Sequence, residues 1–161
     1  MIFTPFYTFT RPADTTQYAA GDLIANSATA ASVVPLSWGL NGGGRWGTIR
    51  AARLYKSNKT VTAASFRLHL FTASPGVPTH GDNGAIVVAS AADYIGSIAA
   101  DMSSSGFAGG TTGAFQRATA AINFCVPSLT GKLFGLIEAV GTYTPASAET
   151  FTATLEIELT T

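Results

Sequence analysis

A strict alternation of side chains near the C-terminus constrains the fold of this chain more than any other feature of its sequence. Between Thr150 and Leu159, every second position is apolar, and the positions in between are threonine or glutamate. Successive side chains of a β-strand point to opposite faces of the sheet. The pattern therefore predicts an antiparallel strand that buries one face and leaves the other in water.

The segment before this strand is apolar on both faces. Residues 133–140 have the composition of a central strand that is covered on each side. Residues 141–147 contain turn-forming residues and Pro145, so they predict a connection between the two strands. Looser patterns predict further strands at residues 23–25, 31–36, 48–56, 66–71 and 114–126, with Phe66, Leu68 and Leu70 pointing inward. Residues 85–101 are rich in alanine and permit either a helix or a strand.

Glycine and proline separate these segments throughout the chain. Short strands punctuated in this way favour an antiparallel sandwich or jelly roll over a parallel sheet with crossover helices. A length of 161 residues suits one compact domain. The predicted fold class is therefore all-β: an antiparallel β-sandwich or jelly roll, with a single domain at residues 17–161 and an extended N-terminal arm.

The predicted arm covers residues 1–16. Four aromatic side chains, Phe3, Phe6, Tyr7 and Phe9, occur close together, and Pro5 interrupts them. Proline lacks the N–H group that the interior of a sheet requires, so an extended arm or an edge strand is expected here. Either its own domain or a neighbouring subunit can cover so apolar a segment.

The charge content limits the partners of the chain. Nine lysine and arginine residues balance nine aspartate and glutamate residues, and only 11% of all residues are charged, against about 25% in an average protein. Nucleic acids and anionic membranes attract proteins through lysine and arginine, so neither is an expected partner. The N-terminus has no secretory signal and no apolar run is long enough to span a bilayer, so we expect synthesis in the cytoplasm without export.

The balanced charges are separated along the sequence. Six of the nine cationic residues lie between Arg45 and Arg67, and all four glutamates follow Lys132. Such complementary stripes can pair across the strands of one sheet or across a subunit interface, and pairing within one sheet is the commoner arrangement. Arg50 and Arg53 fall on opposite faces of a regular strand, so one of them is expected to be buried in a pair or to face a partner.

The sequence offers no set of residues for catalysis or for metal binding. His69 and His80 are the only histidines, and there is no Gly-x-Ser-x-Gly motif. A lone Cys125 excludes an internal disulfide and a cysteine zinc cluster, and its strand context predicts an inert buried thiol. Asp93 and Asp101 lie in a segment of uncertain structure, whereas Glu156 and Glu158 belong to a predicted solvated strand face. We therefore expect no enzyme, no cofactor and no metal.

Two tryptophans flank a glycine-rich loop. Trp38 and Trp46 lie on either side of residues 41–44. Exposed aromatic rings can serve as platforms for sugars, whereas in strands they more often fill a core or a subunit contact. Both interpretations remain open.

Three stretches resemble small structural proteins of tailed bacteriophages, some of which are capsid cement or decoration proteins. They are Arg11–Asp22, Phe66–Phe71 followed by Pro75, Pro78 and Asp82–Asn83, and Leu133–Val140 followed by Tyr143–Pro145. The resemblance implies a β-rich subunit, commonly a homotrimer, which sits on the outer capsid surface of the virion and binds the major capsid protein.

The resemblance includes no binding motif that would identify individual contact residues in this chain. From composition alone, the candidate subunit or capsid contacts are Phe3, Phe6, Tyr7, Phe9, Arg11, Arg45, Trp46, Arg50 and Arg53. The alternative function is a glycan- or receptor-binding module of a phage tail or fibre, for which Trp38 and Trp46 would supply the platforms.

Overall fold

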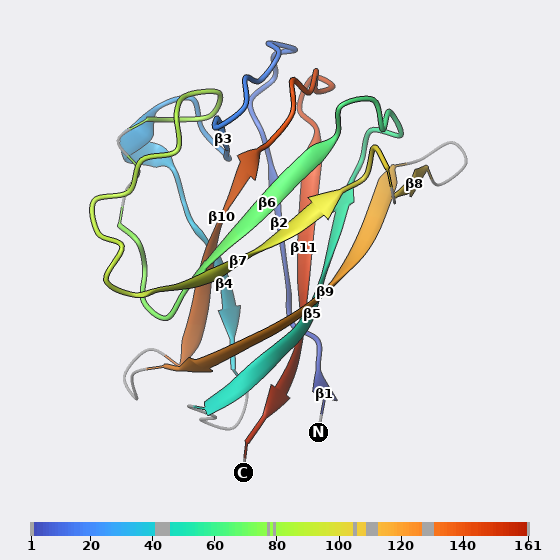
Figure 1. The fold of residues 1–161 in the computed structure, drawn as a ribbon. Coiled ribbons are helices and arrows are strands. Elements are labelled where there is room, and N and C mark those ends of the chain that lie inside the picture. The colour runs from blue at the N-terminus through green and yellow to red at the C-terminus, as the bar shows by residue number, and fades with distance from the viewer. Residues whose placement is uncertain are drawn as a thin grey trace.

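The chain folds into a β-sandwich of two antiparallel sheets (Figure 1). The computed structural model describes residues 2–40, 46–76, 78, 80–104, 106–108, 113–126 and 131–160. The predicted all-β sandwich is thereby confirmed. Within these residues, no helix is long and apolar enough to cross a membrane.

Sheet A is built around the C-terminal strand. Its order is β8, β9, β5, β11, and both β1 and β2 pair with the remaining edge of β11. Its strands are β1 (Ile2–Phe3), β2 (Phe6–Thr10), β5 (Trp46–Lys56), β8 (Phe107–Ala108), β9 (Ala114–Cys125) and β11 (Thr150–Leu159). The alternation in β11 matches the prediction, because Phe151, Ala153, Leu155 and Ile157 are fully buried while threonines occupy the other face.

Sheet B is built around β10. This strand pairs with β6 on one edge and with both β3 and β4 on the other, and β7 follows β6. Its strands are β3 (Leu23–Ile24), β4 (Leu36–Gly39), β6 (Ser65–Phe71), β7 (Tyr94–Asp101) and β10 (Lys132–Ala139). Phe66, Leu68 and Leu70 of β6 point into the core, as predicted.

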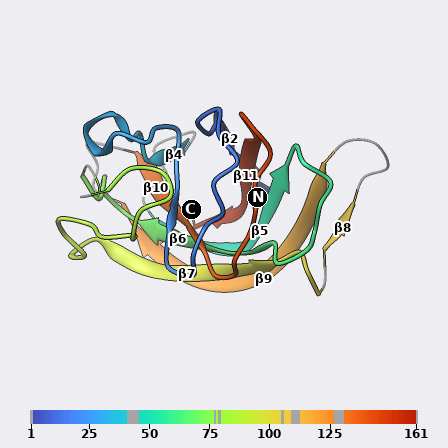
Figure 2. The same ribbon diagram turned by 90° about the horizontal axis from the view of Figure 1, so that it is seen from above.

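Both faces of β10 are covered, as its composition predicted. Its inner face belongs to the main core between the sheets, and its outer face places Leu136 in a second, smaller cluster. The other buried members of this cluster are Leu23, Ala25, Val33 and Phe71. The segments around residues 25–33 and 86–88 therefore form a cover over the outside of sheet B (Figure 2).

This cover explains one wrong prediction and resolves one segment that the sequence left open between helix and strand. The predicted strand at residues 31–36 is wrong: the chain forms a short 3-10 helix at Ala30–Ser32 and enters β4 only at Leu36. Residues 85–93 contain no regular helix or strand, and β7 follows them. Val33, Ile86 and Val88 pack on the second cluster, so their apolar character serves this cover and does not mark a strand.

The N-terminal segment is the edge of its own sheet. β2 pairs with β11 from Thr10 opposite Thr150 to Phe6 opposite Thr154. Phe9 is buried and stacks on Phe151 with a centroid separation of 5.8 Å. The sequence left open whether this segment packs on its own domain or on a neighbouring subunit. Phe9 packs on its own domain.

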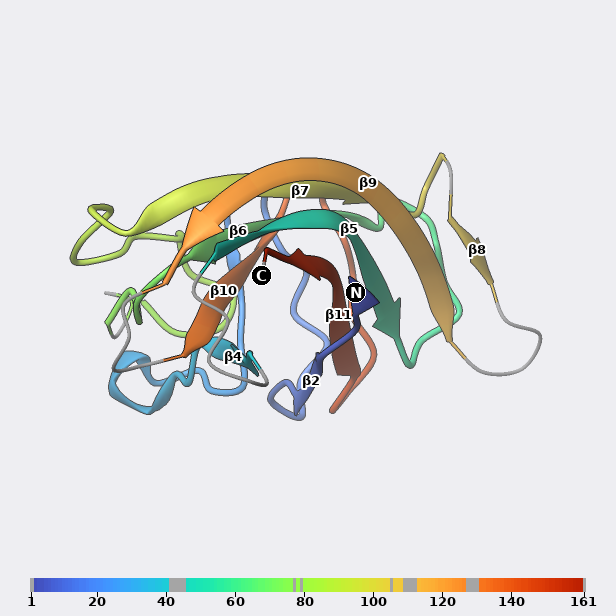
Figure 3. The same cartoon turned by 90° about the horizontal axis from the view of Figure 1, so that it is seen from below.

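A bulge at Arg50 bends sheet A. Opposite β11, Arg50 is an extra residue between the pairs Ile49–Ile157 and Ala51–Glu156, and the register with β9 shifts at the same place. Bulges increase the local twist and bend a strand. Figure 3 shows the result, since β9 runs as a long arc over β5. Because the extra residue reverses the alternation, Arg50 and Arg53 share one face, and the prediction that they lie on opposite faces is wrong.

Candidate contact surface on sheet A

The outer face of sheet A is a grid of side chains from five strands: β1, β2, β5, β9 and β11. One row across the strands joins Phe6, Thr154, Arg53 and Arg117, because each residue lies opposite the next. A neighbouring row joins Thr8, Thr152, Tyr55 and Phe115, and a third joins Ile2, Glu158, Thr48 and Asn123. Within two of the rows, threonine hydroxyls form hydrogen bonds across neighbouring strands: Thr8 with Thr152 at 2.7 Å, and Thr48 with Asn123 at 2.7 Å.

The charges on this face are paired. Glu156 accepts hydrogen bonds from Nε of Arg53 at 2.7 Å and from Nε of Arg117 at 2.8 Å, and Arg117 adds a second bond at 2.6 Å. The two hydrogen bonds from Arg117, followed by the one from Arg53, lower the pKa of Glu156 to about 2. Arg50 pairs with Glu158. The expected pairing of the two charge stripes within one sheet is confirmed here, and Arg67 with Glu138 repeats it in sheet B.

Glu156 differs from its predicted environment. A solvated strand face was expected, but only 7% of this residue is exposed. The two arginines lie over the carboxylate and shield it from water. Glu158, at the margin of the sheet, remains about half exposed.

Three large apolar side chains on this face are exposed. Ile2, Phe6 and Trp46 expose 66%, 70% and 62% of their surface. Between Arg53, Arg117 and the stacked rings of Tyr55 and Phe115, the face is hollowed by about 390 Å³. The combination of exposed aromatic residues, arginines and a shallow hollow is typical of protein contact sites.

The predicted contact residues divide between this face and the interior. Phe6, Trp46, Arg50 and Arg53 lie on the outer face of sheet A, and Arg45 falls outside the described residues. Phe3 and Tyr7 are half-buried, whereas Phe9 belongs to the main core. The sequence analysis did not identify Ile2 and Arg117 as contact residues. Ile2 lies opposite Glu158 only because β1 pairs with β11, and the residues next to Ile2 in the sequence do not reveal that pairing.

Arg11 is a structural residue and is not available to a partner. Its side chain is fully buried and forms an ion pair with Asp82 at 3.0 Å. Nε donates to the hydroxyl of Tyr18 at 2.7 Å, and that hydroxyl donates to Asp82 at 2.7 Å. Further bonds to the carbonyl oxygens of Asp14 and Ala146 use the remaining nitrogen. The network joins three loops at one end of the sandwich.

A second buried network lies around Lys56. Its Nζ donates to the hydroxyl of Tyr143 at 3.0 Å and lies 3.6 Å from Glu149. Tyr143 donates to Glu149, whose second oxygen accepts the N–H of Ala146 at 3.1 Å. Burial lowers the pKa of Lys56 and raises the pKa of Tyr143. Since Lys56 and Glu149 have no exposed side-chain surface, this network fixes the connection before β11.

Two further predictions need correction. Trp38 is 1% exposed and donates from Nε1 to the carbonyl oxygen of Ala153 at 3.0 Å, so it joins the two sheets inside the core. It therefore cannot act with Trp46 as a sugar platform. Cys125 is exposed, although a buried thiol was predicted, because the alternation of β9 turns it to the outer face beside Trp46.

The described part of the chain contains no group of three histidine, cysteine or acidic side chains that could hold a metal ion.

Comparison of the sequence with protein-family models and with curated proteins gives no match. Among solved structures, the K1 cleaved adhesin domain of Lys-gingipain from Porphyromonas gingivalis W83 is weakly similar, with a TM-score of 0.31 and 9% identity over 99% of this chain and 91% of that chain.

Proposed function

We propose that this protein is a non-enzymatic structural protein of a phage virion, which binds the outer capsid surface as a trimer and stabilises the shell. Its partners in this role are copies of itself and the major capsid protein. The observation that carries the proposal is the outer face of sheet A, where Ile2, Phe6 and Trp46 are exposed beside paired arginines.

Apolar side chains exposed to this extent favour burial by a partner. Covering an aromatic ring removes its surface from water, and aromatic residues and arginines contribute most of the affinity in many interfaces. The hollow between Tyr55, Phe115 and the two arginines can receive a side chain of the partner. Thr8 and Thr152, which are hydrogen-bonded to each other, add polar surface beside these apolar anchors.

The paired charges support a permanent contact more than long-range attraction. Arg50, Arg53 and Arg117 already have carboxylate partners within the subunit. A partner therefore meets a face with oriented guanidinium groups and little net charge. Such a face favours a partner of complementary shape and hydrogen bonding over polyanions in general. A cement protein that binds only the assembled lattice stabilises that lattice by mass action.

The first test is the mass of the isolated protein and its binding to shells. Sedimentation equilibrium should give about three times the 16.5 kDa of one chain, and the protein should co-sediment with phage capsids that lack it. Decorated capsids should withstand higher temperature than bare ones. A strict monomer that never sediments with capsids would refute the proposal.

Variants of the contact face test where binding occurs. Phe6→Ser and Trp46→Ser should each weaken capsid binding by about tenfold or more, because each removes an exposed aromatic anchor. Val34→Ser is the matched control, since Val34 is 55% exposed but lies beside the cover of sheet B. Equal binding by all three variants would place the contact elsewhere on the molecule.

A further inference from the structure

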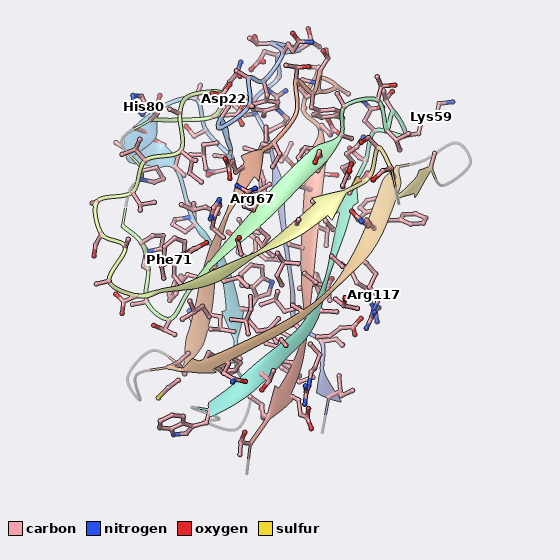
Figure 4. All side chains as sticks on the ribbon, in the orientation of Figure 1. Asp22, Lys59, Arg67, Phe71, His80 and Arg117 are labelled. Atoms are coloured by element: carbon pink, nitrogen blue, oxygen red, sulfur yellow. The ribbon has the colours of Figure 1, made fainter. Side chains whose placement is uncertain are left out.

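A second surface hollow lies on the outside of sheet B, away from the proposed capsid contact. Arg67 and His69 extend from β6, Glu138 from the neighbouring β10 and Tyr94 from β7. The four residues line a hollow of about 400 Å³, within the usual size range of small-molecule sites, about 300–1,000 Å³. Figure 4 shows Arg67 and Arg117 apart from each other, and the residues that line this hollow differ from those that line the hollow on sheet A.

A chain of hydrogen bonds orients the polar side of this hollow. Nε2 of His69 lies 2.7 Å from Oε2 of Glu138, and Nδ1 lies 3.3 Å from the hydroxyl of Tyr94. A carboxylate can only accept, so we assign the histidine proton to Nε2, which leaves Nδ1 to accept from Tyr94. Arg67 donates to the same Oε2 at 3.2 Å. Among the described residues, Oε1 of Glu138 accepts no bond and is available to a ligand.

The other side of the hollow is apolar. Ile86, Val88 and Ala91 of the segment that covers sheet B line it. Tyr94 closes one end and is 42% exposed, with its ring held by Phe71 and His69 at centroid separations of 5.4 and 5.8 Å. A ligand in this hollow would therefore contact fixed hydrogen-bonding groups on one side and hydrocarbon on the other.

Tyr94 also joins this hollow to a second one. The adjoining space of about 350 Å³ is lined by Tyr94, Asp93, Thr72 and Asn123, and it ends at Trp46. The two hollows therefore share Tyr94, and the second one reaches Trp46, which belongs to the proposed capsid contact.

The charges limit which ligands suit the first hollow. An anion would face Glu138, and a cation would face Arg67, so either would meet a like charge at short range. A hydrocarbon would remove water from the Arg67–Glu138 pair without replacing the lost hydrogen bonds. A neutral polyol satisfies both groups, because each hydroxyl both donates and accepts, and its C–H faces can lie on Tyr94 and the apolar wall.

We propose that the Arg67–His69–Glu138–Tyr94 hollow binds a neutral oligosaccharide. This function is additional to capsid binding and does not depend on it. It also differs from the pair of tryptophans that the sequence offered as platforms, since Trp38 is buried.

The test is calorimetric titration of the full-length protein with four probes: maltohexaose, cellohexaose, chitohexaose and a neutral bacterial O-polysaccharide. At least one should bind with a Kd of about 1 mM or tighter. Tyr94→Ala and Glu138→Gln should each weaken that binding by about tenfold or more, which corresponds to about 1.4 kcal/mol. Tyr94→Phe keeps the ring and should retain most of the affinity. Phe6→Ser, on the other face, should bind as the wild type does.

Urea unfolding of each variant establishes that it is folded before its affinity is interpreted. The proposal is overturned if none of the four probes binds, or if binding persists unchanged in both Tyr94→Ala and Glu138→Gln. Preferential binding of a sulfated hexasaccharide would also overturn it, because a polyanion should be repelled by Glu138. Loss of capsid binding with intact oligosaccharide binding, or the reverse, distinguishes the two proposed functions.

Discussion

At the scale of single residues, buried ion pairs hold the loops at one end of the sandwich. Arg11 and Asp82 are 71 positions apart, and neither has appreciable exposed side-chain surface. A buried charge whose partner is removed remains in a medium that cannot solvate it. Asp82 therefore stabilises the folded protein chiefly by supplying the countercharge for Arg11.

Replacement of Asp82 by Asn should lower the free energy of unfolding by about 3–5 kcal/mol, because it leaves Arg11 buried without its countercharge. Asp14 provides the matched control: it also pairs with Arg11, but its side chain is 42% exposed. Asp14→Asn should cost about 1 kcal/mol or less. Urea unfolding monitored by circular dichroism measures both, and similar losses would contradict the structural role given to Asp82.

Glu156 should make the free energy of unfolding depend on pH in the acidic range. Its pKa is about 2 in the folded protein against an ordinary value of 4.5, so its contribution is complete above about pH 4.5 and disappears as the pH falls toward 2. Glu156→Gln should therefore be less stable than the wild type at neutral pH, and the difference should shrink as the pH falls. Urea midpoints at about pH 7, about pH 4 and about pH 2.5 provide the measurement. A difference that stays constant with pH would show that Glu156 titrates normally.

At the scale of elements, the bulge in β5 decides which side chains form the contact face. If β5 were a regular strand without the bulge, Arg50 and Arg53 would point in opposite directions, and one arginine would enter the core. With it, both reach glutamates on the outer face, while Ile49 and Leu54 are both buried. The bulge therefore reconciles the charge pattern with the core.

Deletion of Arg50 should be tolerated about as well as its replacement. Removing the residue leaves Ile49 opposite Ile157 and Ala51 opposite Glu156, so the pairing with β11 becomes regular and Ile49 stays in the core. Arg50→Ala keeps the extra residue and removes only a half-exposed ion pair, which should cost about 1 kcal/mol or less. Thermal unfolding followed by circular dichroism compares the two variants. A deletion variant that lost cooperative unfolding would contradict this expectation and show that the bulge is required for the fold.

At the scale of the whole molecule, the fold depends on contacts between distant parts of the chain. β11 pairs with β1 and β2 from the N-terminus and with β5 from the middle. The two sheets also present different exteriors, since sheet A is bare while segments from two loops cover part of sheet B. One molecule can therefore carry two separate binding surfaces.

This topology predicts slow folding. Proteins dominated by distant strand pairings fold on the order of milliseconds to seconds, because long loops must close before the pairings form. Trp38 becomes fully buried between the sheets and reports on this step. Stopped-flow fluorescence of Trp46→Phe, which leaves Trp38 as the probe, should show refolding in that range. A microsecond phase that accounted for the whole signal would contradict the prediction.

The sequence by itself determined the β-sandwich and most of the buried faces. Alternation in residues 150–159 and the double-sided apolar run at 133–140 are local patterns, and the pleat of a strand converts them directly into faces. The separated charge stripes likewise predicted pairing within a sheet, because complementary charges on neighbouring strands attract one another.

The tertiary structure alone decided which residues share a surface. The bulge at Arg50, the burial of Arg11 by Asp82 and the meeting of Arg67, His69, Glu138 and Tyr94 all depend on strand register and on loops far apart in the sequence. An inserted residue reverses every side chain beyond it, and an ion pair has no local signature. The alternating strand at residues 150–159 thus specified its own two faces, but the neighbours that make its outer face a candidate contact came only with the fold.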